Sequence, residues 1–209
     1  MEATLQVLTV LAFAAAAWRV GAVSLDGALA GIGVAGLLTW RFGWGGFVML
    51  LVFVVLGTTI SERSGRRRDA VQVLCNGGAA AIAAACGWPA AAAGALAAAL
   101  SDTAASELGK RYGGVPRQIL FGGRLEPGRD GGMSWLGTIA GLAFAWPVPL
   151  VAWAFGILPD FRVVSWIAAA GMIGNLIDSV LGATIQRRLG ARGNDWVNLA
   201  ATTAAATLA

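Results

Sequence analysis

The sequence of 209 residues contains no histidine and only two cysteines, and 12% of its residues are charged. Cys75 and Cys86 stand eleven positions apart in or beside one apolar run, too far for a disulfide within a single helix. With so few soft or nitrogen ligands, a zinc, haem or iron–sulfur centre is not expected. A soluble domain carries about 25% charged residues, so this composition excludes a water-soluble fold.

Long apolar runs fill the space between short charged islands, and 57% of the residues are hydrophobic. Each run approaches the roughly 20 residues that a helix needs to cross a bilayer. We therefore predict an all-α, polytopic transmembrane helical bundle of about seven to eight spans. Pro147 and Pro149 predict a kink or break in the sixth span. The predicted spans are residues 3–20, 22–40, 44–60, 70–87, 89–107, 134–158, 161–186 and 195–209.

Basic residues are distributed unequally between the two sets of predicted loops. Thirteen of the fifteen lie in loops that follow odd-numbered spans, and only Arg41 and Arg162 lie on the other side. Because cytoplasmic loops are enriched in lysine and arginine, this predicts a multi-pass protein with its N-terminus outside. The thirteen are Arg19, Arg63, Arg66, Arg67, Arg68, Lys110, Arg111, Arg117, Arg124, Arg129, Arg187, Arg188 and Arg192.

Two aspartates stand inside predicted spans, Asp102 in the fifth and Asp178 in the seventh. A carboxylate at membrane depth costs several kcal/mol unless it is paired or hydrated, so each is a candidate functional residue. The alternative is a structural role, with each aspartate paired to an arginine of a neighbouring helix. Chain direction places both, together with Asn76 and Asn198, in one layer below the cytoplasmic surface, and Glu107 lies near that layer. We therefore predict a shared site.

Carboxylate and amide oxygens suit Mg²⁺, which takes one or two carboxylates and completes its shell with water and phosphate oxygens. The loop 109–134 follows the fifth span and contains five cations and eight glycines. Arginines bind phosphate in pairs of hydrogen bonds, and glycines let backbone N–H groups approach an anion. An ordinary solvated cytoplasmic loop would explain the charge but not the glycines. We predict that a phosphate-bearing, lipidic substrate meets Mg²⁺ at the membrane edge.

Several segments resemble a membrane family that includes the plant phytyl-phosphate kinase and an uncharacterised animal transmembrane protein. Residues 101–109 (SDTAASELG) resemble its D-T-x-A-S-E-x-G signature, although Ala104 stands where a bulky aromatic residue is usual. Arg129 and Asp130 stand where threonine and asparagine are usual. A more distant similarity connects the chain to the CTP-dependent dolichol and phytol kinases. The other matching segments are 68–78 (RDAVQVLCNGG), 127–138 (PGRDGGMSWLGT), 174–186 (GNLIDSVLGATIQ) and 194–198 (NDWVN).

The resemblance implies Mg²⁺-dependent transfer of a phosphoryl group from a nucleoside triphosphate, CTP or similar, to an isoprenyl or phytyl monophosphate. Together with the residues above, it assigns catalysis to Asp102, Glu107 and Asp178, with both aspartates as metal ligands. Ala104 and Ala105 are predicted to line the lipid pocket. The predicted nucleotide- and phosphate-binding residues are Asn76, Lys110, Arg124, Arg129, Gly131, Gly132, Ser134, Thr138 and Asn198.

The expected organisation is one membrane-embedded domain over residues 1–209, with a catalytic core at 66–203 and less characteristic spans at 1–65. The active site is expected on the cytoplasmic face. No nucleic-acid partner is expected, and association of identical copies stays open. A lipid-alcohol kinase or nucleotidyltransferase could use the same residues, with a carboxylate as general base. A cation-coupled transporter is the alternative from another class, although transporters place ionisable residues near the bilayer midplane.

Overall fold

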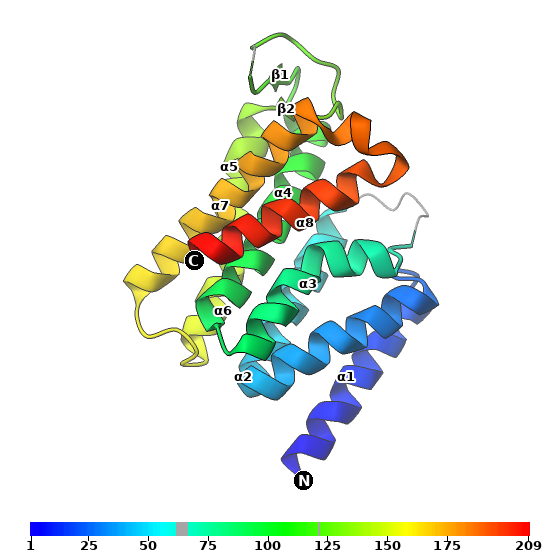
Figure 1. Ribbon diagram of the computed structural model, residues 1–209, viewed down its shortest axis with the longest axis vertical. Coiled ribbons are helices and arrows are strands. Elements are labelled where there is room, and N and C mark those ends of the chain that lie inside the picture. Colours follow the sequence, from blue (N-terminus) through cyan, green and yellow to red (C-terminus); the bar gives the residue numbers. More distant parts are fainter. Residues whose placement is uncertain (62–66, 121) are drawn as a thin grey trace.

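The protein is described by a computed structural model covering residues 1–61, 67–120 and 122–209, and it is a bundle of helices (Figure 1). Arg63 and Arg66, two of the predicted cytoplasmic cations, lie outside the described residues. A short antiparallel strand pair, β1 (Arg117–Gln118) with β2 (Gly132–Met133), ties the ends of the long loop together. The helices are α1 (Glu2–Arg19), α2 (Leu25–Ile60), α3 (Ala70–Cys86), α4 (Pro89–Tyr112), α5 (Trp135–Phe144), α6 (Pro147–Ala154), α7 (Phe161–Thr184), the 3-10 helix η1 (Gln186–Arg192) and α8 (Gly193–Leu208).

Helices occupy all eight predicted segments, and two of the predicted interruptions take definite forms. The second and third predicted spans form α2, which breaks at Gly43, where φ is 60° and ψ is −145°. That backbone conformation favours glycine because it has no Cβ atom. The sixth predicted span divides into α5 and α6, and α6 begins at Pro147 as expected for a residue without an N–H group.

Three parts of the described chain are long and apolar enough to cross a membrane: Leu25–Ile60, Trp135–Ala154 and Phe161–Thr184. The helical, membrane-embedded class is therefore confirmed. The number of crossings and the orientation of the loops stay predictions.

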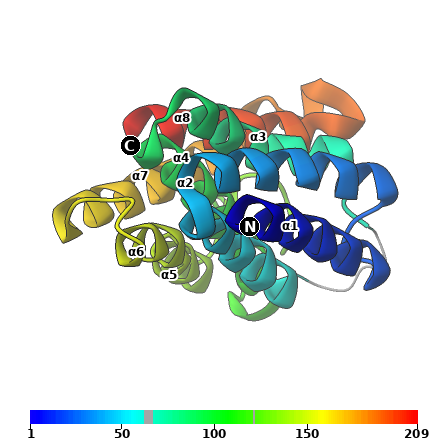
Figure 2. The same ribbon diagram turned by 90° about the horizontal axis from the view of Figure 1, so that it is seen from below.

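The central helix is α4, which packs against α2, α3, α5, α6, α7 and α8. Every residue from Ala92 to Ser101 is buried, and most are alanine. Their small side chains let neighbouring backbones approach closely, as in other membrane helix contacts. The helix α1 lies at the edge of the bundle beside α2 (Figures 1 and 2). The bundle is thus tight around α4 and thinner at α1.

Glycine on α7 permits the closest contact with α4. A Cβ atom added at Gly171 would lie 2.8 Å from the Cβ of Ala97 and 3.2 Å from the backbone N of Ala98. Such a methyl group would push the two helices apart, since neither neighbouring atom belongs to a long flexible side chain.

We therefore expect Gly171→Ala to lower the free energy of unfolding by about 1–3 kcal/mol, as overpacked cores do. Thermal unfolding in detergent, followed by tryptophan fluorescence, measures the effect. Gly36→Ala on α2 is the matched control, because a Cβ atom there meets nothing within 4 Å. Equal melting temperatures for the two variants would contradict close packing of α7 on α4.

Candidate functional site

A cavity of about 1310 Å³ lies between α1, both halves of α2, α3, α4 and the start of α8. Its apolar wall comes from α1 and α2, with Val10, Phe13 and Phe53 among its residues. Its polar residues come from the C-terminal end of α4, the N-terminal ends of α3 and α8, and the segment before α3. The cavity is therefore amphipathic, with its polar groups gathered at one end.

Successive turns of α4 carry three polar side chains into this cavity, those of Asp102, Ser106 and Lys110. Their spacing of four residues places them on one face of the helix. Glu107 also lines the cavity, and its Oε1 lies 3.6 Å from Nζ of Lys110. One helix thus brings both signs of charge to the polar end.

The two predicted aspartates lie side by side although they are 76 positions apart in the sequence. The Asp102 and Asp178 carboxyl groups are within hydrogen-bonding reach of each other, and Ser106 also contacts Asp102. Oδ2 of Asp178 is buried and has no hydrogen-bond partner among the described residues. Two like charges this close cannot both persist unless a proton or a cation is shared between them. The pair is therefore a cation or proton site.

Two asparagines complete the polar end opposite α4. Nδ2 of Asn198 donates to Oδ1 of Asn76 at 3.4 Å, and Nδ2 of Asn76 donates to the carbonyl of Gln72 at 2.9 Å. Both asparagines line the cavity. Oδ1 of Asn198 is buried and lacks a partner among the described residues, so this wall contains an unpaired hydrogen-bond acceptor.

Arg68 was not among the predicted site residues, yet it lines the cavity and organises its rim. Its guanidinium donates to Oγ1 of Thr58 at 3.2 Å and to Oγ of Ser61 at 3.0 Å, at the end of α2. Its backbone N–H donates to the carbonyl of Ala22, and its carbonyl accepts from the N–H of Ser24. The RDAVQVL segment, which begins at this residue, was the sequence signal that could have identified it.

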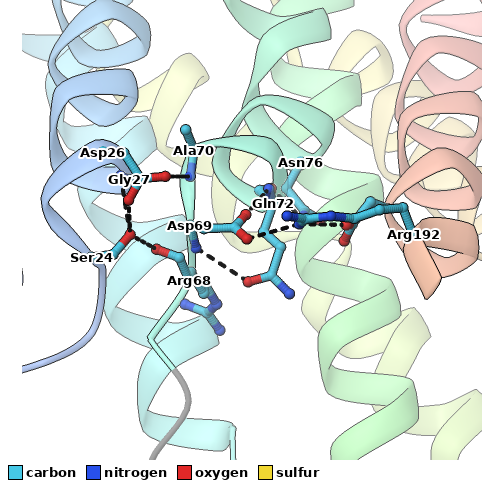
Figure 3. A network of polar contacts seen from close by, with 10 residues as sticks. Ser24, Asp26, Gly27, Arg68, Asp69, Ala70, Gln72, Asn76 and Arg192 are labelled. Carbon is cyan, nitrogen blue, oxygen red and sulfur yellow. Dashed lines mark hydrogen bonds and ion pairs between the residues drawn. The ribbon is translucent and has the colours of Figure 1, made fainter.

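A polar network holds the N-terminus of α3 against its neighbours (Figure 3). Asp69 caps α3 in a reciprocal capping box with Gln72. Nη1 of Arg192 lies 2.8 Å from Oδ2 of Asp69 and 3.1 Å from Oδ2 of Asp195. From the other side, Asp26 on α2 accepts a hydrogen bond from the backbone N–H of Ala70 at 3.0 Å. These contacts fix the polar ends of α2, α3 and α8 relative to one another.

The long loop after α4 does not enter the large cavity as a unit. Lys110 lines it, whereas Arg124 and Arg129 are exposed and do not. Arg129 instead borders a separate cavity of about 220 Å³ between the loop and the end of α7. Asp130 accepts a hydrogen bond there from Nε2 of Gln186 at 2.9 Å. The three predicted phosphate-binding cations therefore do not converge: Lys110 and Arg129 line different cavities, and Arg124 lines neither of them.

The remaining predicted phosphate-binding residues support the loop and the start of α5. Gly131 adopts φ 70° and lies against the backbone of α7 at Ala183. The adjacent Gly132 pairs with β1. Oγ of Ser134 accepts from the backbone N–H of Gly137 at 3.1 Å, and Oγ1 of Thr138 donates to the Ser134 carbonyl at 3.0 Å. These residues therefore contact other parts of the loop, α5 and α7.

Neither predicted lipid-pocket residue lines the large cavity. Ala104 is fully buried, and the side chain of Ala105 faces α5 at Gly141. Their helix turns these positions away from Asp102 and Lys110. Ala104 therefore belongs to the packed core, and Ala105 lies at the contact between α4 and α5.

Among the described residues, no group of three or more His, Cys, Asp or Glu side chains could hold a metal ion. Mg²⁺ needs only one or two carboxylates when water and substrate phosphate complete its shell. Asp102 and Asp178 supply two adjacent carboxyl groups, and one of their oxygens is buried without a partner. The donor set therefore fits Mg²⁺ that is held jointly with a phosphate-bearing substrate.

Comparisons with known proteins indicate that the chain is a membrane protein. A family model described as "Integral membrane protein DUF92" matches residues 8–206. The chain is 31% identical to Protein PGR of Arabidopsis thaliana over 209 residues, covering 78% of this chain and 72% of that protein. It is 39% identical over 107 residues to an uncharacterized membrane protein of Methanocaldococcus jannaschii, covering 51% of this chain and 44% of that protein.

A third similarity is to Protein VTE6, chloroplastic, of Arabidopsis thaliana. The two sequences are 35% identical over 103 residues, which make up 48% of this chain and 30% of that protein. The chain thus spans less than half the length of the archaeal protein and of Protein VTE6 in these matches. No solved structure matches.

The network at α3 generates a pH-dependent prediction. The backbone N–H of Gln72 and the guanidinium of Arg192 hold the pKa of Asp69 below its ordinary value of 3.8. A depressed pKa stabilises the fold above the unfolded value, and this contribution disappears as the pH falls through the folded value. Asn also caps helices well, so Asp69→Asn removes mainly the charge. We expect the wild type to melt higher at neutral pH, with the difference vanishing as the pH falls below the ordinary value of 3.8 and through the folded-state pKa of Asp69.

Melting temperatures of both proteins in detergent, measured from neutral pH downwards, test this. Arg192→Gln should lower the melting temperature at neutral pH at least as much, because it removes this ion pair and the one with Asp195. A difference between wild type and Asp69→Asn that does not change with pH would show that the charge contributes nothing.

Proposed function

The chain belongs to the DUF92 family of integral membrane proteins, and from this premise we propose that it is a lipid-phosphate kinase. It would transfer a phosphoryl group from a nucleoside triphosphate to an isoprenyl or phytyl monophosphate and release the isoprenyl diphosphate. The observation that carries the proposal is that Asp102, which lies beside Asp178, lines the polar end of a cavity whose wall along α1 and α2 is apolar. That combination suits a substrate with a phosphate head and a hydrocarbon tail.

The cations at the polar end support a phosphate-bearing substrate. Arg67, Arg68 and Lys110 line the cavity together with Asp102. Arg111 lines the cavity as well. Arg68 is already bonded to the end of α2, so Arg67, Lys110 and Arg111 are the side chains we assign to substrate phosphates. Lys110 also lies 3.6 Å from Glu107, which limits the positions that its ammonium group can take.

The proposed reaction needs no histidine. The attacking group of a monophosphate is already an oxyanion, so the protein has no proton to remove from it. Phosphoryl transfer depends chiefly on holding two phosphates in line and on neutralising the charge of the transferring group. When bound, Mg²⁺ would supply part of that neutralisation. Asp102 and Asp178 would hold the ion, and Lys110 would orient the phosphate oxygens.

Relatives and motifs support the same reaction class. The chain is similar to Protein VTE6, chloroplastic, over about half its length. Its motifs resemble those of the phytyl-phosphate kinase family, and the two aspartates of those motifs are the pair that lies together. A transporter is less well supported, because the polar side chains of the cavity gather at one end.

The carboxylate pair can be tested by isosteric substitution. Asp102→Asn and Asp178→Asn should each lower the rate of phosphoryl transfer by roughly 100-fold or more, the size of effect seen when one electrostatic group is removed. Purified protein in detergent with Mg²⁺ and labelled triphosphate gives the rates. Asp160→Asn is the matched control, because Asp160 caps the opposite end of α7 and asparagine retains that cap. Wild-type rates in both test variants would remove the pair from the mechanism.

The chemical nature of the acceptor, a monophosphate or an alcohol, distinguishes the proposed kinase from a lipid-alcohol kinase. An alcohol would need a general base, whereas a monophosphate would not. We expect labelled phosphate in the diphosphate when farnesyl, geranylgeranyl or phytyl monophosphate is supplied, and little or none with the free alcohols. Each acceptor is tested with CTP, UTP, GTP and ATP. Rapid phosphorylation of an alcohol beside an inert monophosphate would instead identify a lipid-alcohol kinase.

A further inference from the structure

We propose that the apolar part of the cavity, between α1 and the two halves of α2, holds the prenyl chain of the acceptor. This inference rests on the proposed function and adds where the lipid lies and which residues limit its length. We name this part the tail chamber, defined by Val10, Phe13, Gly31, Val34, Ala35, Leu50, Phe53 and Val54. All of these residues precede the segment where the family motifs begin.

Three helical segments each line the chamber with the residues of one helix face. On α1 the lining residues are 10, 13, 14 and 17; on the first half of α2 they are 27, 28, 31, 34 and 35. On the second half of α2 they are 50, 53, 54 and 57. This spacing of three and four residues marks one face of each helix. The chamber is therefore a feature of whole helix faces.

Small side chains keep the chamber open. A Cβ atom added at Gly31 would meet nothing within 4 Å, although Gly31 faces the cavity. The neighbouring lining positions on the same face are Ala28 and Ala35. Because bulkier residues there would fill the space, these positions determine how much hydrocarbon the chamber accepts.

The chamber leads inward from the polar end. From Gly27 to Val34, and from Gly57 back to Leu50, the helices run seven residues, or about 10 Å at 1.5 Å per residue. Gly57 and Gly27 stand beside the rim formed by Arg68, whereas Val34 and Leu50 belong to the buried core. A phosphate held near Asp102 and Lys110 would thus send its chain past Gly31.

The polar end offers groups for a cation as well as for a phosphate. Oδ1 of Asn198 is a buried acceptor without a partner among the described residues, and a hydrogen-bond donor or a cation would satisfy it. Arg67 and Lys110 add positive charge suited to a phosphate. An apolar chamber joined to such an end is complementary to an anionic lipid with one chain.

The wall formed by α1 provides a route from the bilayer. This helix packs chiefly on α2, and its outer face exposes Leu5, Leu8 and Leu11. In Figure 2 it lies at the outside of the bundle beside α2. A single helix therefore separates the chamber from surrounding lipid. A chain longer than the chamber can extend past α1 into the membrane.

Binding of labelled prenyl monophosphates, measured without nucleotide, tests the chamber separately from transfer. Gly31→Leu should weaken binding of farnesyl monophosphate by about tenfold or more, because it adds four carbons to the chamber and a single methylene already changes affinity about tenfold in an apolar pocket. Gly31→Ala should give a smaller loss in the same direction. Dimethylallyl monophosphate, with its single isoprene unit, should be affected least. Gly33→Leu is the matched control, because Gly33 is exposed, does not line the cavity and also meets nothing within 4 Å.

The outcomes distinguish the chamber from the reaction. Selective loss of binding in Gly31→Leu without any phosphoryl transfer in the wild type would support the chamber and reject the kinase. Transfer with unchanged binding in both Gly31 variants would support the kinase and reject the chamber. Equal losses in Gly31→Leu and Gly33→Leu, or losses independent of chain length, would also overturn the chamber, as would a wild type that binds no prenyl monophosphate.

Discussion

Close contact between small residues on α4 is the constraint on which the rest of the bundle depends. In lipid, apolar side chains gain little from leaving the solvent, so helices associate through van der Waals contact and hydrogen bonds. The alanines between Ala92 and Ser101 supply that contact on every side of α4. At Ser101 the contact also becomes polar, because its hydroxyl donates to the Gly141 carbonyl and accepts from Asn175. The next residue is Asp102, so the packed part of α4 leads directly into the site.

The same preference for small residues has opposite consequences at the two sides of the bundle. Where a neighbouring helix is close, as Gly171 is to Ala97, small side chains produce contact. Where α1 and the halves of α2 diverge, glycine at position 31 leaves open space instead. The dense packing around α4 and the open space beside α1 therefore both result from the abundance of small residues.

The polar end is stabilised by groups that are distinct from those proposed to act on substrate. Asp69, Arg192 and Asp195 form one ion-paired cluster, and Arg68 fastens the end of α2. These contacts position Asn76 and Asn198 opposite α4. Among the described residues, one buried oxygen of the Asp102–Asp178 pair has no hydrogen-bond partner, as the proposed cation site requires.

The sequence by itself determined the class of protein and the helical segments, and it identified Asp102 and Asp178 as candidate site residues, because hydropathy and the cost of buried charge act locally. Pro147 and Pro149 likewise indicated the interruption of the sixth span, and the gap between the second and third predicted spans coincides with the break at Gly43. Tertiary structure alone decided the assignment of side chains to cavities. It brought Lys110 to the large cavity and left Arg124 and Arg129 outside.

Tertiary structure also packed Ala104 into the core. The apolar wall of the large cavity comes from the N-terminal helices, whose sequence is the least characteristic part of the chain. The physical reason is that periodicity shows which residues share a helix face. Only packing determines what that face meets.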